Sequence, residues 1–133
     1  MKNLFLYALL SLYTGSSNIK IDGLLNEYYQ NQNIRFEITN FDSSKKYYYI
    51  SVEYCENKIW SELINDINNP KLNMSLISEI DPKEKIKVNI PVKKIFYLKN
   101  FLNFKLYRLK VSYGDSNNKL NRKYYSKNFK IVN

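Results

Sequence analysis

Paired carboxylates are the side chains of this sequence best suited to acid–base chemistry. Three pairs are separated by three or four positions along the chain: Glu53 with Glu56, Glu62 with Asp66, and Asp81 with Glu84. Two acids held several ångströms apart can hydrolyse a glycosidic bond, provided that their environments separate their pKa values. In strands and turns such acids more often balance nearby lysines. The pairs therefore support a small acid-based hydrolase only as the least favoured alternative.

Two further residue types bear on catalysis. The chain has no histidine, so it lacks the commonest general base and the commonest metal ligand. Cys55 is the only cysteine, and one cysteine can neither close an intrachain disulfide nor build a thiolate zinc site. We therefore expect a non-enzymatic protein with no catalytic residue, no metal site and no small-molecule cofactor.

The charge is strongly positive, because 21 basic and 12 acidic residues give a formal net charge of +9. Such a balance is typical of proteins that bind nucleic acids, anionic polymers or anionic membrane surfaces. However, eighteen of the basic residues are lysine and only three are arginine, whereas bidentate phosphate recognition favours arginine. The lysines are also dispersed, with no run longer than a pair. Binding of an anionic polymer is therefore expected only as an alternative function.

Residues 1–17 have the three parts of a secretory signal peptide. Lys2 supplies the basic start, residues 4–13 form an apolar run, and Gly15 to Ser17 are small residues suited to cleavage. The run is too short to span a membrane. We expect export to the periplasm, cell surface or medium, and one mature domain over residues 18–133 without a membrane span. The alternative is an ordinary N-terminal helix or strand packed on the core.

Beyond residue 32 the hydrophobic period is two, which predicts half-buried strands. Ile34, Phe36 and Ile38 alternate with polar residues in the stretch NIRFEITN. Apolar patterns of the same kind place further strands at residues 46–54, 58–64, 86–90, 106–113 and 124–132. Residues 71–80 fit either a short strand or a helical turn, and no long helix is expected. Six or seven strands spaced by about ten residues predict an all-β sandwich.

The alternation also predicts which side chains face the core. In KYYYISVEYC the β-branched residues Ile50 and Val52 should point inward together with Tyr48 and Tyr54. A shift by one residue would instead bury Glu53. The inward residues of the last two stretches are Tyr107, Leu109, Val111, Tyr113, Phe129 and Ile131.

The order of these elements resembles that of a bacterial immunoglobulin-like domain. The resemblance covers roughly residues 30–132 and rests on five stretches: NIRFEITN, YYYISVEYCENKIW, KIKVNIPV, LYRLKVSYG and YYSKNFKIV. It implies an antiparallel β-sandwich of about seven strands, with a corner tyrosine at Tyr107 and a core tryptophan at Trp60. It also implies an envelope or surface module that binds, spaces or assembles.

The outward residues provide a candidate binding site. If residues 46–54, 58–64, 105–113 and 124–132 form one sheet, its outer face carries six aromatic or cationic side chains: Tyr47, Tyr49, Arg108, Lys110, Tyr124 and Lys130. Aromatic rings beside cations can grip a protein partner or stack on sugars and bases. The alternative is that tyrosine and lysine merely suit an exposed strand surface.

These observations predict an exported, non-enzymatic binding or structural module of a bacterial cell envelope. Its expected partner is a protein of the envelope, contacted through the outer face of the sheet. The main alternative is a binder of an anionic polymer, either polysaccharide or nucleic acid, through exposed lysines and tyrosines. The two functions differ in salt dependence, because electrostatic polymer binding weakens steeply as ionic strength rises.

Overall fold

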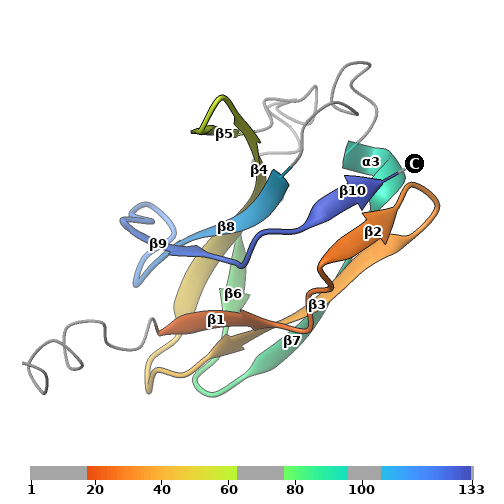
Figure 1. Cartoon of the computed structure of the whole chain (residues 1–133). Helices are drawn as coiled ribbons and strands as arrows, with labels where there is room; N and C mark the ends of the chain where they lie inside the picture. The colour runs from red at the N-terminus through yellow and green to blue at the C-terminus, as the bar shows by residue number, and fades with distance from the viewer. Residues whose placement is uncertain (1–17, 63–76, 96–105, 133) are drawn as a thin grey trace, which may run out of the picture.

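The computed structural model describes residues 18–62, 77–95 and 106–132 (Figure 1). These residues are mostly β-strand, with one helical turn, α3 (Val92–Ile95). The strands are β1 (Ile19–Asp22), β2 (Glu27–Tyr29), β3 (Asn33–Asn40), β4 (Lys46–Glu56), β5 (Ile59–Glu62), β6 (Ser78–Ile80), β7 (Lys85–Pro91), β8 (Leu106–Gly114), β9 (Arg122–Tyr125) and β10 (Lys130–Val132). The predicted all-β class is confirmed. Within the described residues, no helix has the length and apolar character needed to cross a membrane.

The strands form three sheets in the described part of the chain. β1, β3 and β7 make an antiparallel three-stranded sheet, in the lower half of Figure 1. β5, β4, β8 and β9 make an antiparallel sheet, and β6 becomes its fifth strand by pairing with the start of β4. β2 and β10 form the third sheet and run parallel to each other.

The two larger sheets contribute to one apolar core. β3 provides the three buried residues Ile34, Phe36 and Ile38, as the alternation predicts. β8 and β4 provide the other predicted set, with Tyr107, Leu109, Val111, Tyr113 and Tyr48 buried and Ile50, Val52 and Tyr54 partly buried against them. The register explains this agreement, because it places inward residues of neighbouring strands directly opposite each other.

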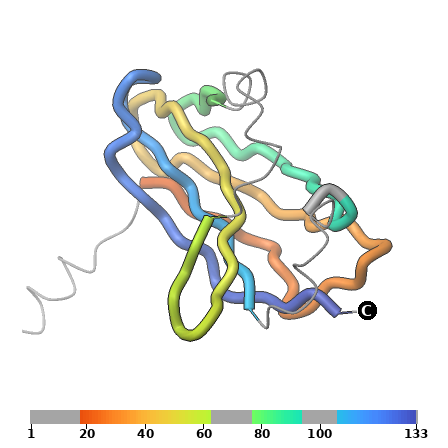
Figure 2. The backbone as a smooth tube through the Cα atoms, turned by 90° about the horizontal axis from the view of Figure 1, so that it is seen from above, coloured from red at the N-terminus to blue at the C-terminus, as the bar shows by residue number. Residues whose placement is uncertain are grey.

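The β4 strand continues into β5 through a two-residue turn. Asn57 and Lys58 have φ values of 50° and 65°, the left-handed conformation that a tight hairpin requires. The turn places Trp60 opposite Cys55. The predicted hairpin is confirmed, and Figure 2 shows it, coloured yellow to green, extending away from the rest of the molecule.

Phe129 links the last strands to the core through two aromatic contacts. Its ring centroid lies 5.5 Å from that of Tyr28, edge to face, and 6.0 Å from that of Tyr107, nearly parallel. Burial raises the pKa of Tyr107 to about 12. The Tyr28 hydroxyl accepts a 2.8 Å hydrogen bond from the Leu25 backbone N–H. The inward placement predicted for Phe129 and Ile131 is confirmed.

The expected count of about seven strands is not confirmed, because the described residues contain ten. β1 and β2 were not predicted because they are only four and three residues long, shorter than the alternating runs on which the other predictions rest. The last predicted strand is two strands, of which β9 joins the five-stranded sheet and β10 joins β2. Between them Ser126 holds a bend, because its hydroxyl accepts a 2.8 Å hydrogen bond from the Leu109 N–H and its own N–H donates to the Leu109 carbonyl.

Some predictions concern residues that the structure does not describe. The signal peptide expected over residues 1–17 lies outside the described residues, and so do residues 71–76 of the ambiguous stretch. The last three residues of the ambiguous stretch form a strand, β6.

A buried lysine joins the β3–β4 turn to the loop after β8. The Lys46 side chain is only 2% exposed, and its Nζ lies 2.6 Å from a carboxylate oxygen of Asp42. The same Nζ contacts the Asp115 carboxylate and donates a 2.7 Å hydrogen bond to Ser44. Burial lowers the pKa of Lys46, but its bonds to Asp115 and Asp42 outweigh this effect, so its pKa is raised. The hydrogen bond from Lys46 is the main cause that lowers the pKa of Asp42 to about 2.

Replacing Lys46 by methionine should remove the ion pairs that connect the two loops. We expect Lys46→Met to lower the free energy of unfolding at pH 7 by about 1 to 3 kcal/mol, because two carboxylates lose their shared partner. The loss should shrink as the pH falls from about 4 to 2. The pKa of Asp42 is depressed in the folded protein, so its contribution is complete above its ordinary pKa and disappears on protonation. Urea denaturation at a series of pH values measures both effects.

The neighbouring residue provides a matched control. Lys45 Nζ lies 2.9 Å from Glu79, but the two side chains are 44% and 56% exposed. Lys45→Met should therefore cost clearly less stability than Lys46→Met. Equal losses in the two variants would contradict the role assigned to Lys46.

Candidate binding surface on the five-stranded sheet

One face of the five-stranded sheet, called the outer face here, points away from the core. Antiparallel pairing places Glu53 opposite Arg108 and Ser51 opposite Lys110, so polar residues of β4 and β8 share this face. The side chains of the outer face that concern binding are Tyr47, Tyr49, Ser51 and Glu53 of β4, Trp60 and Glu62 of β5, Arg108 and Lys110 of β8, and Tyr125 of β9.

Arg108 lies at the centre of the outer face, between two aromatic rings. Its guanidinium carbon is 4.2 Å from the Trp60 ring centroid and 4.1 Å from the Tyr125 ring centroid. Its Nε donates a 2.6 Å hydrogen bond to Glu53. Arginine suits this position because its planar cation can stack on aromatic faces while its N–H groups bind a carboxylate. These contacts connect side chains of β5, β4, β8 and β9, which are neighbours in that order in the sheet.

Glu53 points outward as predicted, yet its side chain is only 9% exposed. A second cation, Lys110, lies 3.7 Å from Glu53 and 3.2 Å from Glu62. Two acids and two bases thus neutralise one another at this place. The outward side of the strand is therefore less exposed than the simple alternation predicts.

Tyr49 lies farther along the same face, opposite Ser112. Burial raises the pKa of Tyr49, and the nearby Glu62 carboxylate adds a smaller effect in the same direction. Ser51, the next outward residue of β4, is buried, and its hydroxyl has no hydrogen-bond partner among the described residues.

The structure brings together four of the six residues that the sequence predicts for this site. Tyr47, Tyr49, Arg108 and Lys110 share the outer face. The predicted placement of Tyr124 and Lys130 is wrong. Tyr124 lies opposite the core residue Val111 and packs against the core, because β9 pairs one residue out of step with the predicted parity. Lys130 lies in β10, opposite Glu27, in the two-stranded sheet.

The prediction omitted Tyr125, Trp60 and the two glutamates that neutralise the face. Tyr125 occupies the place assigned to Tyr124, opposite Lys110. Trp60 faces outward against Arg108, so the core position implied by the family resemblance is wrong for this residue. The two-residue hairpin was the available signal, since its register places Trp60 opposite the outward residue Cys55.

Tyr107, the predicted corner residue, is fully buried at the start of β8. The chain just before it, residues 96–105, lies outside the described residues, so the corner contact itself stays a prediction.

The paired carboxylates occupy structural positions in the described residues. Glu53 and Glu62 contact cations of β8. Glu84 accepts a 2.7 Å hydrogen bond from the Asp81 N–H and so closes the turn before β7. Asp66 is not among the described residues. No group of three or more possible metal ligands gathers in the part of the chain that the structure describes.

Comparisons with known proteins show a likeness of fold alone. No protein-family model matches this sequence, and no curated protein is significantly similar to it. Among solved structures, the chain is similar to part of a β-glucosidase from Listeria innocua in complex with glucose, with a TM-score of 0.51 and 11% identity. The same enzyme in complex with isofagomine gives a TM-score of 0.49 and 12% identity. In both, the match covers 86% of this chain and 16% of the glucosidase chain.

Replacing Arg108 by lysine tests the aromatic stack, since lysine keeps the charge but lacks the planar group. We expect Arg108→Lys to lower the free energy of unfolding by about 1 to 2 kcal/mol. Trp60 is the only tryptophan of the chain, so its fluorescence reports on this contact directly. Its emission should shift to longer wavelength as the ring gains contact with water.

Arg122→Lys is the matched control for that experiment. Arg122 lies 5.2 Å from the Tyr113 ring and 2.9 Å from Asp115, away from Trp60 in the register. Its replacement should leave the emission of Trp60 unchanged. An unchanged emission in Arg108→Lys would count against the stack.

Proposed function

We propose that the chain is an immunoglobulin-like β-sandwich. In such a sandwich the first, second and fifth principal strands share one sheet, and the third, sixth and seventh share the other. With β2, β5, β6 and β10 set aside, this arrangement fits β1, β3 and β7 in one sheet and β4, β8 and β9 in the other. The parallel pairing of β2 with β10 then joins the first and last parts of the domain.

We propose further that the protein is a non-enzymatic binding module that contacts a protein partner through the outer face. The observation that carries this proposal is Arg108 held between Trp60 and Tyr125. Tryptophan, tyrosine and arginine are the residue types most enriched among those that dominate binding energy at protein interfaces. Because neighbouring contacts already hold the side chains in place, a partner would pay little conformational entropy on binding.

The electrostatics of the outer face favour a protein partner over an anionic polymer. Arg108 and Lys110 are paired with Glu53 and Glu62, so a polyanion would have to displace these carboxylates. Polyanion binding depends on cations that are free to neutralise phosphate or sulfate charges. The alternative of polysaccharide or nucleic acid binding through lysines therefore has less support at this face.

A protein partner should be retained through Tyr125, whose side chain is 42% exposed. We expect the purified chain, immobilised, to retain a partner from detergent-solubilised envelopes of its native cells. Tyr125→Ser should weaken this retention by about tenfold or more. Tyr29→Ser, which removes a similarly exposed tyrosine from β2, should leave it unchanged.

The salt dependence of retention distinguishes protein binding from polyanion binding in the same assay. Retention through the outer face should persist at about 0.5 M sodium chloride, where the Debye length is roughly 4 Å. Loss of binding by moderate salt, together with retention of nucleic acid at low salt, would instead favour the anionic polymer. Equal effects of the two tyrosine variants would contradict the assignment to the outer face.

We also propose that the protein is exported to the cell envelope or beyond. The support is the signal-peptide pattern of residues 1–17. Cell fractionation and mass spectrometry should find the chain outside the cytosol and beginning near residue 18. Recovery of the uncut chain from the cytosol alone would be incompatible with this proposal.

A further inference from the structure

β9 forms one end of the five-stranded sheet, beside the outer face. It pairs with β8 on one side, and within the described residues no strand pairs with its other side. Figure 2 shows the blue stretch that contains β9 along one margin of the molecule. An edge strand of this kind presents unpaired backbone N–H and C=O groups, which can pair with a strand of another chain.

The pairing with β8 decides which backbone groups of β9 are unpaired. The Ser126 N–H donates a 2.9 Å hydrogen bond to the Leu109 carbonyl. Hydrogen-bonded and non-hydrogen-bonded pairs alternate along an antiparallel ladder, so the backbone groups of Tyr124, two residues earlier, also bond to β8. Those of Lys123 and Tyr125 therefore point away from β8, toward the open side. Neither residue has a backbone partner on that side in the part of the chain that the structure describes.

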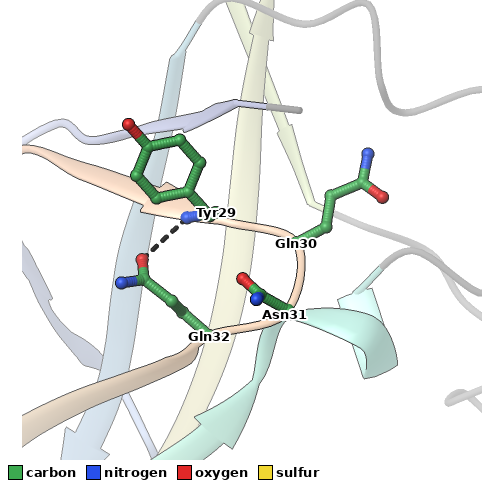
Figure 3. Close-up of a pocket in the computed structure, with 4 residues that line it drawn as sticks. All are labelled: Tyr29, Gln30, Asn31 and Gln32. Carbon is green, nitrogen blue, oxygen red and sulfur yellow. Dashed lines mark hydrogen bonds between the residues drawn. The ribbon is translucent and has the colours of Figure 1, made fainter.

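The end of β2 differs from this edge, because its own turn closes it. The Tyr29 N–H donates a 2.8 Å hydrogen bond to the Gln32 carboxamide oxygen, as Figure 3 shows, and the Tyr29 carbonyl accepts a 3.0 Å bond from the Gln32 N–H. Tyr29 and Tyr125 are similarly exposed, at 51% and 42%. Only the backbone of Tyr125 is available to an added strand.

The open edge is strongly basic. Residues 116–133 contain five basic residues and no acidic one. Among the described basic residues of this stretch, only Arg122 forms an ion pair, with Asp115. Lys123 is exposed and shares the outer face, because it lies opposite Ser112, which in turn lies opposite Tyr49. Unlike the neutralised centre of the outer face, this edge can attract acidic groups.

Charge and backbone pairing together favour one occupant of the edge. A second copy of this chain is disfavoured, because pairing two identical edges would bring their cations together. A polyanion would neutralise the lysines but offers no regular row of donors to the carbonyls of Lys123 and Tyr125. An extended peptide offers both donors and acceptors, and acidic side chains on it would complement the cations.

We propose that the protein partner adds an acidic, extended segment to β9 as a further strand of the sheet. This inference rests on the proposed protein-binding function and specifies how the partner docks. The backbone of the segment pairs with Lys123 and Tyr125. Because alternate side chains of a strand fall on one face, the segment places an acidic side chain beside Lys123 and an apolar one beside the Tyr125 ring.

Amide hydrogen exchange of the full chain tests this assignment. The probe is a synthetic peptide of alternating glutamate and valine, about eight residues long. In the free protein the amides of Lys123 and Tyr125 should exchange faster than that of Tyr124, which bonds to β8. Adding the peptide to about 1 mM should slow the exchange of these two amides by about tenfold or more. No slowing, or slowing only at other amides, would overturn the proposal.

Two control peptides separate backbone pairing from charge. A peptide of alternating glutamate and proline keeps the negative charges but loses the N–H group of every second residue. A peptide of alternating lysine and valine keeps the N–H groups but reverses the charge. Each should bind about tenfold more weakly than the first peptide, or worse, in fluorescence anisotropy at low salt. Equal binding of the two glutamate peptides would show attraction by charge alone and would contradict strand addition.

Lys123→Pro removes one N–H from the open edge while the Tyr125 side chain stays in place. Proline is tolerated on edge strands where its nitrogen faces solvent, and thermal unfolding shows whether the variant folds. Lys123→Pro should weaken binding of the glutamate–valine peptide by about tenfold or more. The matched control Lys123→Thr loses the charge but keeps the N–H, so its loss should be smaller. Equal losses in the two variants would count against backbone pairing.

Retention of the partner from solubilised envelopes distinguishes this inference from the proposed function. Loss of retention in both Lys123→Pro and Tyr125→Ser would support both. Loss in Tyr125→Ser alone would overturn strand addition and leave the binding function of the outer face intact. Unchanged retention in both variants would overturn both.

Discussion

Strands β4 and β8 pair antiparallel without interruption from Tyr47 opposite Gly114 to Cys55 opposite Leu106. This single register decides both faces of the five-stranded sheet. On the inner face it places Ile50 opposite Val111, which belongs to the core. On the outer face it places Glu53 opposite Arg108, the residue that Trp60 and Tyr125 also contact. A shift by one residue would move a carboxylate into the core and disperse the aromatic stack.

Several of the basic side chains are neutralised by acidic side chains beside them. The whole chain carries a formal charge of +9, but the outer face pairs two cations with two acids. The buried Lys46 is likewise shared by two aspartates. The charges of these elements are therefore used in contacts within the fold. This is why the proposed partner of the outer face is a protein and not a polyanion.

Prediction from the sequence succeeded where burial follows a period of two. Ile34, Phe36 and Ile38 and the inward residues of β8 needed no knowledge of their partners. It failed where a strand is short or where the chain changes sheets. The bend at Ser126 depends on hydrogen bonds to Leu109, seventeen positions away, so the separation of β9 from β10 had no local signal. The exchange of Tyr124 for Tyr125 has the same cause, because the parity of β9 is set by its pairing with β8.

The sequence by itself determined the all-β class, the inward residues of the long strands and the hairpin after Glu56. These features depend on the alternation of side chains along one strand, which is a local property of the backbone. Only the tertiary structure decided that Arg108 lies between Trp60 and Tyr125. These three residues come from separate stretches of the chain, and their proximity depends on long-range pairing and packing that no local pattern encodes.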